Sequence, residues 1–213
     1  MKFTPKNIEE NVNVSKTHPL VEFGWLPGGL LLLVLILYLL LGVATDIAVA
    51  KIPVSVEVWL GEHFVDRMDA LENEPLQRLI QPLLDKLPAD SPLREYDFYV
   101  QMVDNEQINA LALPGGQIVV FSGLVEQAES ENEVAMVLAH ELGHFAHRDH
   151  LRRLGRGLGL TVAAIVLFGE DSAVSNLASK FFLVGESHYS REQESAADRF
   201  GLELLVAGYG HAG

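Results

Sequence analysis

The longest apolar run of the chain lies near its N-terminus. Residues 23–45 carry no charge, and the stretch from Leu30 to Leu41 is almost continuous Leu, Ile and Val. A helix needs about 20 apolar residues to span a bilayer. No polar face interrupts this run, as it would in a helix packed on a soluble core. The pattern therefore predicts a transmembrane anchor over residues 23–50, preceded by a cytoplasmic N-terminal segment, residues 1–22.

A cleaved signal peptide is the alternative interpretation of this run, because Ala48-Val49-Ala50 resembles a small-residue cleavage site. The preceding segment is long and contains Glu9, Glu10 and Glu22, and the run exceeds a typical signal core. An uncleaved anchor is therefore favoured. Lysines precede the run and Lys51 follows it, and we expect the N-terminus inside and the remainder of the chain outside.

The middle of the chain changes from helical to strand periodicity. From Pro53 to Leu87 the apolar residues recur at three- and four-residue intervals, which predicts helix broken by prolines. A short strand is predicted around residues 98–103. Next, residues 109–121 place a Pro-Gly-Gly turn between two β-prone runs, which predicts a hairpin.

The C-terminal half is predicted to be helical. Ser130-Glu131-Asn132-Glu133 matches a capping box that opens a helix. Residues 157–169 form a second apolar stretch after four arginines. This stretch is too short to cross a bilayer alone, so a packed helix is favoured over one that dips into the membrane. A further helix is predicted over residues 186–206. The expected fold class is α+β and mainly helical, with a small β-hairpin or sheet.

Length and composition limit the classes of function. The 213 residues suffice for one domain with a single core plus a short extra element. A formal charge of −14 disfavours a nucleic-acid surface, because phosphate binding requires a basic field. The chain has no cysteine, which excludes disulfides, thiolate metal sites and a thiol nucleophile. Any bound metal must therefore be held by histidine and carboxylate.

The predicted helix after Ser130 contains the motif HExxH, as His140-Glu141-Leu142-Gly143-His144. Four residues are about one helical turn, so both imidazoles share one face and can bind one ion. Glu141 is then turned toward the adjacent open coordination position. Imidazole is a good zinc ligand, and a catalytic zinc site keeps three protein ligands and one water. The motif predicts a single zinc ion with Glu141 beside it.

Two plans could supply the third ligand. His150 has the spacing of HExxHxxGxxH, but that plan needs a glycine to end the helix and turn the chain, and His147 stands there. We expect a continuing helix to carry His150 away from the ion, and neither histidine is assigned a metal role. The second plan takes a carboxylate from another helix. Glu194 fits it, and Asp198, on the same face, could accept the free imidazole N–H of a ligand. Glu192 stays an alternative ligand.

Three separated motifs together resemble one family. His140-Glu-Leu-Gly-His144, the later Ser190-Arg-Glu-Gln-Glu194-Ser-Ala-Ala-Asp198 and the earlier Asn109-Ala-Leu-Ala-Leu-Pro-Gly-Gly resemble the zinc metalloendopeptidases of the HtpX, CAAX prenyl protease and BepA type. The similarity spans roughly residues 65–210. It implies a zincin-type metallopeptidase domain, here residues 51–213. It also implies zinc ligands His140, His144 and Glu194, the general base Glu141 and the supporting carboxylate Asp198.

The resemblance also implies that the hairpin strand binds an extended substrate, through Asn109, Ala110, Leu111 and Ala112. A purely structural hairpin is the alternative. A residue that stabilises the oxyanion is not assigned; the candidates are His188, Tyr189, Arg191 and His211. Members of the family usually continue with further helices, whereas this chain stops at Gly213, so we expect either a C-terminally incomplete domain or an open cleft.

The expected function is that of a membrane-anchored, zinc-dependent metalloendopeptidase that hydrolyses internal peptide bonds. Its partners would be protein or peptide substrates and the lipid bilayer. By analogy it would act in envelope protein quality control, in a bacterial inner membrane with the peptidase domain in the periplasm. The alternatives are a non-catalytic, chaperone-like zinc protein and a metal-buffering accessory that binds more than one ion. A base beside the motif histidines argues against a purely structural zinc site.

Overall fold

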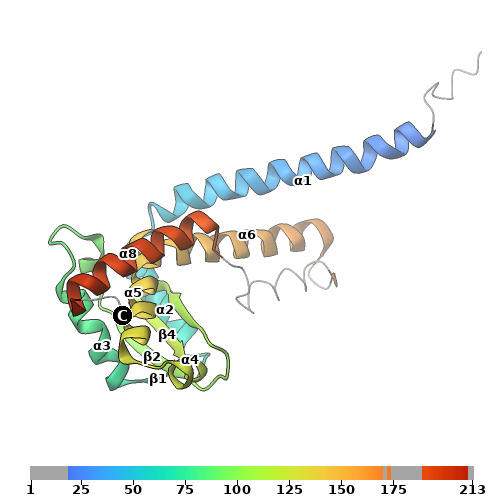
Figure 1. Cartoon of the computed structure of the whole chain (residues 1–213). Helices are drawn as coiled ribbons and strands as arrows, with labels where there is room; N and C mark the ends of the chain where they lie inside the picture. The colour runs from blue at the N-terminus through green and yellow to red at the C-terminus, as the bar shows by residue number, and fades with distance from the viewer. Residues whose placement is uncertain (1–18, 170–171, 174–188, 211–213) are drawn as a thin grey trace, which may run out of the picture. The chain divides into compact units, whose positions relative to one another are not determined.

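The computed structural model describes residues 19–169, 172–173 and 189–210 of the chain (Figure 1). The chain divides into two compact units, Met1–Val43 and Ala44–Gly213. The sequence-based domain bounds of residues 23–50 and 51–213 stay predictions.

Helix α1, Pro19–Val49, carries the long apolar run. Its segment Pro27–Val49 has a mean hydropathy of 2.6, and only 6% of its most apolar part is buried. Leu31 and Leu40 are typical of its side chains, with well over half of their surface exposed. Among the described residues this is the one helix long and apolar enough to cross a bilayer, which confirms the expected apolar helix. It begins four residues before the uncharged run.

The second unit combines helices with a small sheet. In chain order its elements are α2 Val54–Val65, β1 Leu71–Glu72, α3 Glu74–Asp85, η1 Pro92–Glu95, β2 Tyr99–Val103, β3 Ala110–Leu113, η2 Pro114–Gly116, β4 Gln117–Phe121, α4 Ser122–Gln127, α5 Glu131–Ala146, α6 Asp149–Phe168 and α8 Arg191–Tyr209.

The described strands form one four-stranded sheet in the order β1-β2-β4-β3. Strands β3 and β4 are the expected antiparallel hairpin, with Leu111 opposite Val119. Its turn needs the two glycines, because Gly115 and Gly116 both have positive φ. Strand β2 confirms the strand expected near residues 98–103, and it pairs with β4 in parallel. Strand β3 is left at the edge of the sheet.

The core lies between the sheet and helices α3, α5 and α8. Ile80 and Leu83 of α3, Leu138 and Leu142 of α5, and Leu205 of α8 are fully buried in one cluster. Burying a leucine or isoleucine side chain contributes about 1.5–3 kcal/mol. The buried face of α5 thus fixes the rotation of that helix, and with it the direction in which its polar face points.

Four sequence-based details are corrected. The break in the helix expected over residues 53–87 is not at a proline but at residues 66–73, where β1 forms and Asp69 has positive φ. Ser130 caps α5, but the Glu133 carboxylate accepts from the Glu129 N–H, so no reciprocal capping box forms there. Helix α8 begins at Arg191 and ends at Tyr209, whereas residues 186–188 lie outside the described residues.

The fourth correction concerns residues 157–169. They are helical, as the C-terminal part of α6, but they are not packed as expected. Val162 is 59% exposed and Val166 is 77% exposed, and of the large apolar side chains from Leu158 to Phe168 every one is exposed. An exposed apolar surface of this kind is typical of a membrane or protein contact.

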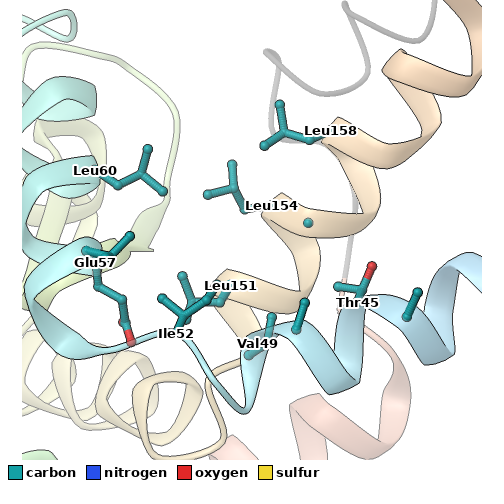
Figure 2. Close-up of a pocket in the computed structure, with 12 residues that line it drawn as sticks. Thr45, Val49, Ile52, Glu57, Leu60, Leu151, Leu154 and Leu158 are labelled. Atoms are coloured by element: carbon teal, nitrogen blue, oxygen red, sulfur yellow. The ribbon is translucent and has the colours of Figure 1, made fainter.

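An apolar cavity of about 340 Å³ lies within the second unit. It is lined by Thr45 and Val49 at the end of α1, by Leu60 of α2 and by leucines of α6, of which Leu151, Leu154 and Leu158 are labelled in Figure 2. None of the sequence-predicted site residues lines this cavity. It is therefore separate from the polar face of α5.

A buried carboxylate beside this cavity connects distant parts of the unit. Glu57 of α2 is 0% exposed. Its oxygens accept hydrogen bonds from the Arg148 guanidinium and the Tyr96 hydroxyl, and His150 Nε2 lies 3.3 Å away. Arg148 also donates to the carbonyls of Val49 and Ile52. Burial raises the pKa of Glu57, but the bonds from His150 and Arg148 outweigh it and leave this pKa below 4.5.

We expect Glu57→Gln to destabilise the protein at neutral pH by about 3 kcal/mol, because it leaves the Arg148 charge without its counter-ion. For a unit of this size that lowers Tm by roughly 6–12 °C. The Glu57 pKa is lowered on folding, so its contribution is complete above pH 4.5 and is lost as the pH falls through the folded-state value.

Thermal unfolding of the full chain in detergent, from pH 7 to pH 3, checks this prediction. Glu62→Gln, an exposed position on the same helix, is the control and should leave Tm unchanged. A Glu57→Gln variant as stable as the wild type at pH 7 would contradict the role of this carboxylate.

Candidate metal centre

Helix α5 brings the two motif histidines together. Their Nε2 atoms lie 3.1 Å apart, and the rings meet edge to face. His144 is 1% exposed, and the side chain of His140 is 20% exposed. Leu138 and Leu142 of the same helix are buried in the core cluster. The spacing of four residues thus produces the arrangement expected from the sequence.

Helix α8 adds a carboxylate to this pair. One Glu194 oxygen lies 3.4 Å from His140 Nε2. One ligand atom from each of His140, His144 and Glu194 lies within 4.8 Å of the other two. Two imidazole nitrogens and a carboxylate oxygen that converge in this way fit zinc, which takes these ligands at about 2.0–2.2 Å and leaves one position open. The donor set therefore suits a catalytic rather than a closed structural site.

Small residues allow α5 and α8 to approach so closely. A Cβ atom on Gly143 would lie 2.7 Å from the Ala197 Cα atom, and one on Gly201 would lie 2.9 Å from the His140 backbone nitrogen. Ala197 is completely buried between the helices. Backbone-to-backbone contact at these positions fixes the distance from Glu194 to the two histidines.

Each imidazole is held from behind by a carboxylate. Asp198 Oδ1 lies 2.9 Å from His140 Nδ1, and the role of Asp198 as a supporting carboxylate stays a prediction. Asp149 Oδ2 lies 3.2 Å from His144 Nδ1, a partner that the sequence analysis missed. A carboxylate on Nδ1 places the proton there and leaves Nε2 as the acceptor toward a metal. Burial raises the pKa of Asp149, but the bonds from His144 and Gln193 outweigh it, so this pKa is lowered.

Glu141 lies beside the group in a buried position. It is 7% exposed, and burial raises the pKa of its carboxyl, although nearby His144 and His140 act in the opposite direction. The backbone N–H of Ala112 donates to this carboxylate. Strand β3 therefore runs directly past Glu141.

The residues proposed for substrate binding lie at the open edge of the sheet. The Asn109 carbonyl oxygen accepts from the Phe121 N–H. In an antiparallel pair the backbone N–H and C=O groups of alternate residues face the partner strand. Those of Leu111 therefore face β4, and those of Ala110 and Ala112 face the open side. The Ala110 N–H is bound by the side chain of Asn109. The carbonyl oxygens of Ala110 and Ala112 face the same open side.

Other candidates lie away from the three ligand atoms. Glu192 is exposed in the first turn of α8 and is not part of the group. His147 caps α5 and bonds the Gly143 carbonyl. His150 is buried against Glu57, so it is no part of the group either, but the expected reason was wrong: α5 does not continue, because the chain turns at Arg148, with φ 54°, and restarts as α6.

Of the two oxyanion candidates that the structure describes, Tyr189 is the one packed on the site. Its ring stacks on His144 with 3.8 Å between centroids, and the Arg153 guanidinium lies 5.4 Å from its ring centroid. Burial, and then the nearby Glu141 carboxylate, raise the pKa of the Tyr189 hydroxyl. Arg191 is exposed at the start of α8. His188 and His211 lie outside the described residues.

Comparison with known proteins identifies the family. The model of peptidase family M48 matches residues 70–212. The mitochondrial metalloendopeptidase OMA1 of Arabidopsis thaliana is 36% identical over 124 residues, 57% of this chain and 25% of the relative. The beta-barrel assembly-enhancing protease of Yersinia pestis is 30% identical over 171 residues, 73% of this chain and 35% of the relative.

The chain thus spans about a quarter to a third of the length of the curated relatives that it matches. The matches confirm the resemblance drawn from the three motifs, and zinc is the metal of this family.

We expect Gly143→Ala to weaken zinc binding, because the added methyl would overlap Ala197 and push α8 away from α5. Glu194 moves away with α8, so at least a tenfold rise in the zinc Kd is expected, as for loss of ligand support. Chelator competition on the purified full chain measures it. Gly28→Ala, where nothing lies within 4 Å of the new methyl, is the control. Equal zinc affinity in Gly143→Ala and wild type would refute the role of this contact.

Proposed function

Because the chain belongs to peptidase family M48, we propose that it is a membrane-anchored zinc metalloendopeptidase that hydrolyses internal peptide bonds. One observation carries the proposal: the ligand atoms of His140, His144 and Glu194 converge within 4.8 Å, directly beside the buried Glu141. The convergence needs residues from two helices, and a general base adjoins it.

In this proposal His140, His144 and Glu194 are the zinc ligands. A zinc ion held by them would supply Lewis-acid chemistry: it would polarise the scissile carbonyl and lower the pKa of a water to about 7. Asp198 holds the imidazole of His140, and Asp149 that of His144, with the ring nitrogens oriented for binding. Their hydrogen bonds raise the basicity of both imidazoles.

Glu141 takes the proton of the attacking water and delivers it to the leaving amine. The carboxylate must accept the proton and hold it until the amine leaves. The Ala112 N–H fixes the carboxylate at the edge of strand β3. Glu141 therefore stands between the proposed ligands and the strand proposed to bind substrate.

The open edge of β3 supports binding of an extended peptide. The carbonyl oxygens of Ala110 and Ala112 face outward and can accept backbone hydrogen bonds from an added strand. A substrate aligned on this edge would pass Glu141, because Ala112 contacts that side chain. The Asn109 carbonyl oxygen and the backbone groups of Leu111 pair with β4 and are not available to a substrate strand.

Membrane anchoring is proposed for α1. Its apolar segment Pro27–Val49 is long enough to span a bilayer, and the exposed apolar side chains of α6 offer a second surface suited to lipid. We propose a single-pass inner-membrane protein, with its N-terminal segment in the cytoplasm and its peptidase domain on the periplasmic side. Envelope protein quality control is the proposed role, in keeping with relatives named as a beta-barrel assembly-enhancing protease.

We expect Glu141→Gln to retain zinc and to lose cleavage of an unfolded protein such as casein by at least a hundredfold, since the amide cannot accept the proton. Glu131→Gln, an exposed position in the first turn of the same helix, is the control and should cleave normally. Cleavage by Glu141→Gln at the wild-type rate would contradict the mechanism. Zinc binding without cleavage of any substrate by the wild type would favour the non-catalytic alternative.

The anchor is tested with two charges in the middle of α1. Leu33→Arg together with Leu37→Arg costs about 2.5–3.5 kcal/mol per residue at the bilayer centre. We expect this variant to be extracted by alkaline carbonate, whereas the wild type and a Leu33→Ile, Leu37→Ile control remain with the membrane. Extraction of the wild type itself would show that α1 does not anchor the chain.

A further inference from the structure

The turn between α5 and α6 brings a buried carboxylate behind the proposed metal site. Helix α5 ends at Ala146, His147 caps it, and Arg148 takes the left-handed conformation with φ 54°. A left-handed residue other than glycine costs free energy unless tertiary contacts hold it. The Arg148 guanidinium holds this conformation by donating hydrogen bonds to the Glu57 carboxylate and to the Val49 and Ile52 carbonyls.

This reversal sets Asp149, the first residue of α6, against both helices of the site. Asp149 is 1% exposed. Its Oδ2 lies 3.2 Å from His144 Nδ1, and its Oδ1 accepts a 2.6 Å hydrogen bond from Gln193 Nε2. Arg152 Nη1 lies 3.5 Å from the same Oδ1. A single carboxylate thus accepts from a side chain of α5 and from a side chain of α8.

Gln193 is itself fixed at the start of α8. Ser190 Oγ accepts from the Gln193 backbone N–H, and Gln193 Oε1 accepts from the Ser190 N–H, which completes a capping box. The amide oxygen is therefore engaged by the cap and the amide nitrogen by Asp149. The next residue in the chain is Glu194. The contacts of Gln193 with Ser190 and Asp149 therefore also fix the position of Glu194 in the first turn of α8.

From these contacts we propose that Asp149 is a positioning residue that joins the two zinc-binding helices. It orients the imidazole of His144 and holds the first turn of α8, so that the ligands from both helices reach one ion. This inference rests on the proposed zinc ligands. The inference goes beyond those ligands. Asp198 lies on α8 and contacts His140 of α5, whereas Asp149 lies on α6 and contacts both α5 and α8.

Asp149→Asn tests the inference with little change in volume. Every described partner of this carboxylate donates, and an amide offers one acceptor and one NH₂ group, so either His144 or Gln193 faces a donor. We expect the zinc Kd of the full chain in detergent to rise about 10–100-fold, as when a partner of a metal-bound imidazole is removed. Asp46→Asn is the control: it removes another carboxylate partner of Arg152 and should leave the zinc Kd unchanged.

A double-mutant cycle separates joining from a purely structural role. Gln193→Ala removes the amide that meets Asp149 and should also raise the zinc Kd. Because both substitutions break one shared contact, their combined effect should be smaller than the product of the single effects. Independent, multiplying effects would show that Asp149 and Gln193 do not act through each other, and would overturn the inference.

The ligand variants distinguish this inference from the proposed function. If His140→Ala keeps its zinc, the proposed site itself is wrong. If His140→Ala and Glu194→Ala lose zinc while Asp149→Asn binds it with the wild-type Kd, the site stands and the positioning role is overturned. Should Asp149→Asn fail to fold, Gln193→Ala carries the test, and an unchanged zinc Kd in that variant overturns the inference.

Discussion

The backbone contact between α5 and α8 is the constraint on which the site depends. The ligands come from helices that are far apart in the sequence, and a metal can be shared only if no bulky side chain separates them. Gly143 faces Ala197, and Gly201 faces the backbone of His140, so the helices meet backbone to backbone. The buried leucines of α3, α5 and α8 favour the same approach. Packing energy therefore supports the geometry that a zinc site needs.

Carboxylates behind the histidines refine this geometry. Asp198 and Asp149 each accept from an Nδ1 atom, which directs both Nε2 atoms to one point. The two carboxylates differ in origin, because Asp198 lies on α8 and Asp149 lies beyond a left-handed turn. That turn is held by Arg148 and the buried Glu57. Contacts thus connect Glu57 of α2, through Arg148 and the adjacent Asp149, to the proposed zinc ligand His144.

The sequence predicts the site where local periodicity is sufficient. The spacing of His140 and His144 places both on one face of a helix, and the spacing of Glu194 and Asp198 does the same on α8. The Pro-Gly-Gly turn predicts the hairpin for the same local reason. Membership of the family rests on these motifs together, and the comparisons confirm it.

The features that the sequence did not predict depend on long-range contacts. The turn at Arg148 has no glycine or asparagine that would predict a left-handed residue. Its conformation is held instead by Val49 and Ile52, about a hundred positions earlier in the chain. Asp149 consequently gave no signal as a partner of His144. Glu57 resembles any polar residue of a helix until Arg148, His150 and Tyr96 surround it. The exposed apolar side of α6 is also unpredicted, since periodicity does not distinguish an exposed apolar face from a packed one.

X-ray absorption at the zinc edge of the purified full chain tests the central claim most directly, because imidazole scattering counts histidine ligands. The account predicts one zinc per chain with two imidazole nitrogens at about 2.0–2.1 Å and oxygen ligands at about 2.0–2.2 Å from Glu194 and water. Glu194→Ala should lose its bound zinc, because the ion is left with two protein ligands. Three or more imidazoles on the ion, or more than one zinc per chain, would contradict a site built from His140, His144 and Glu194.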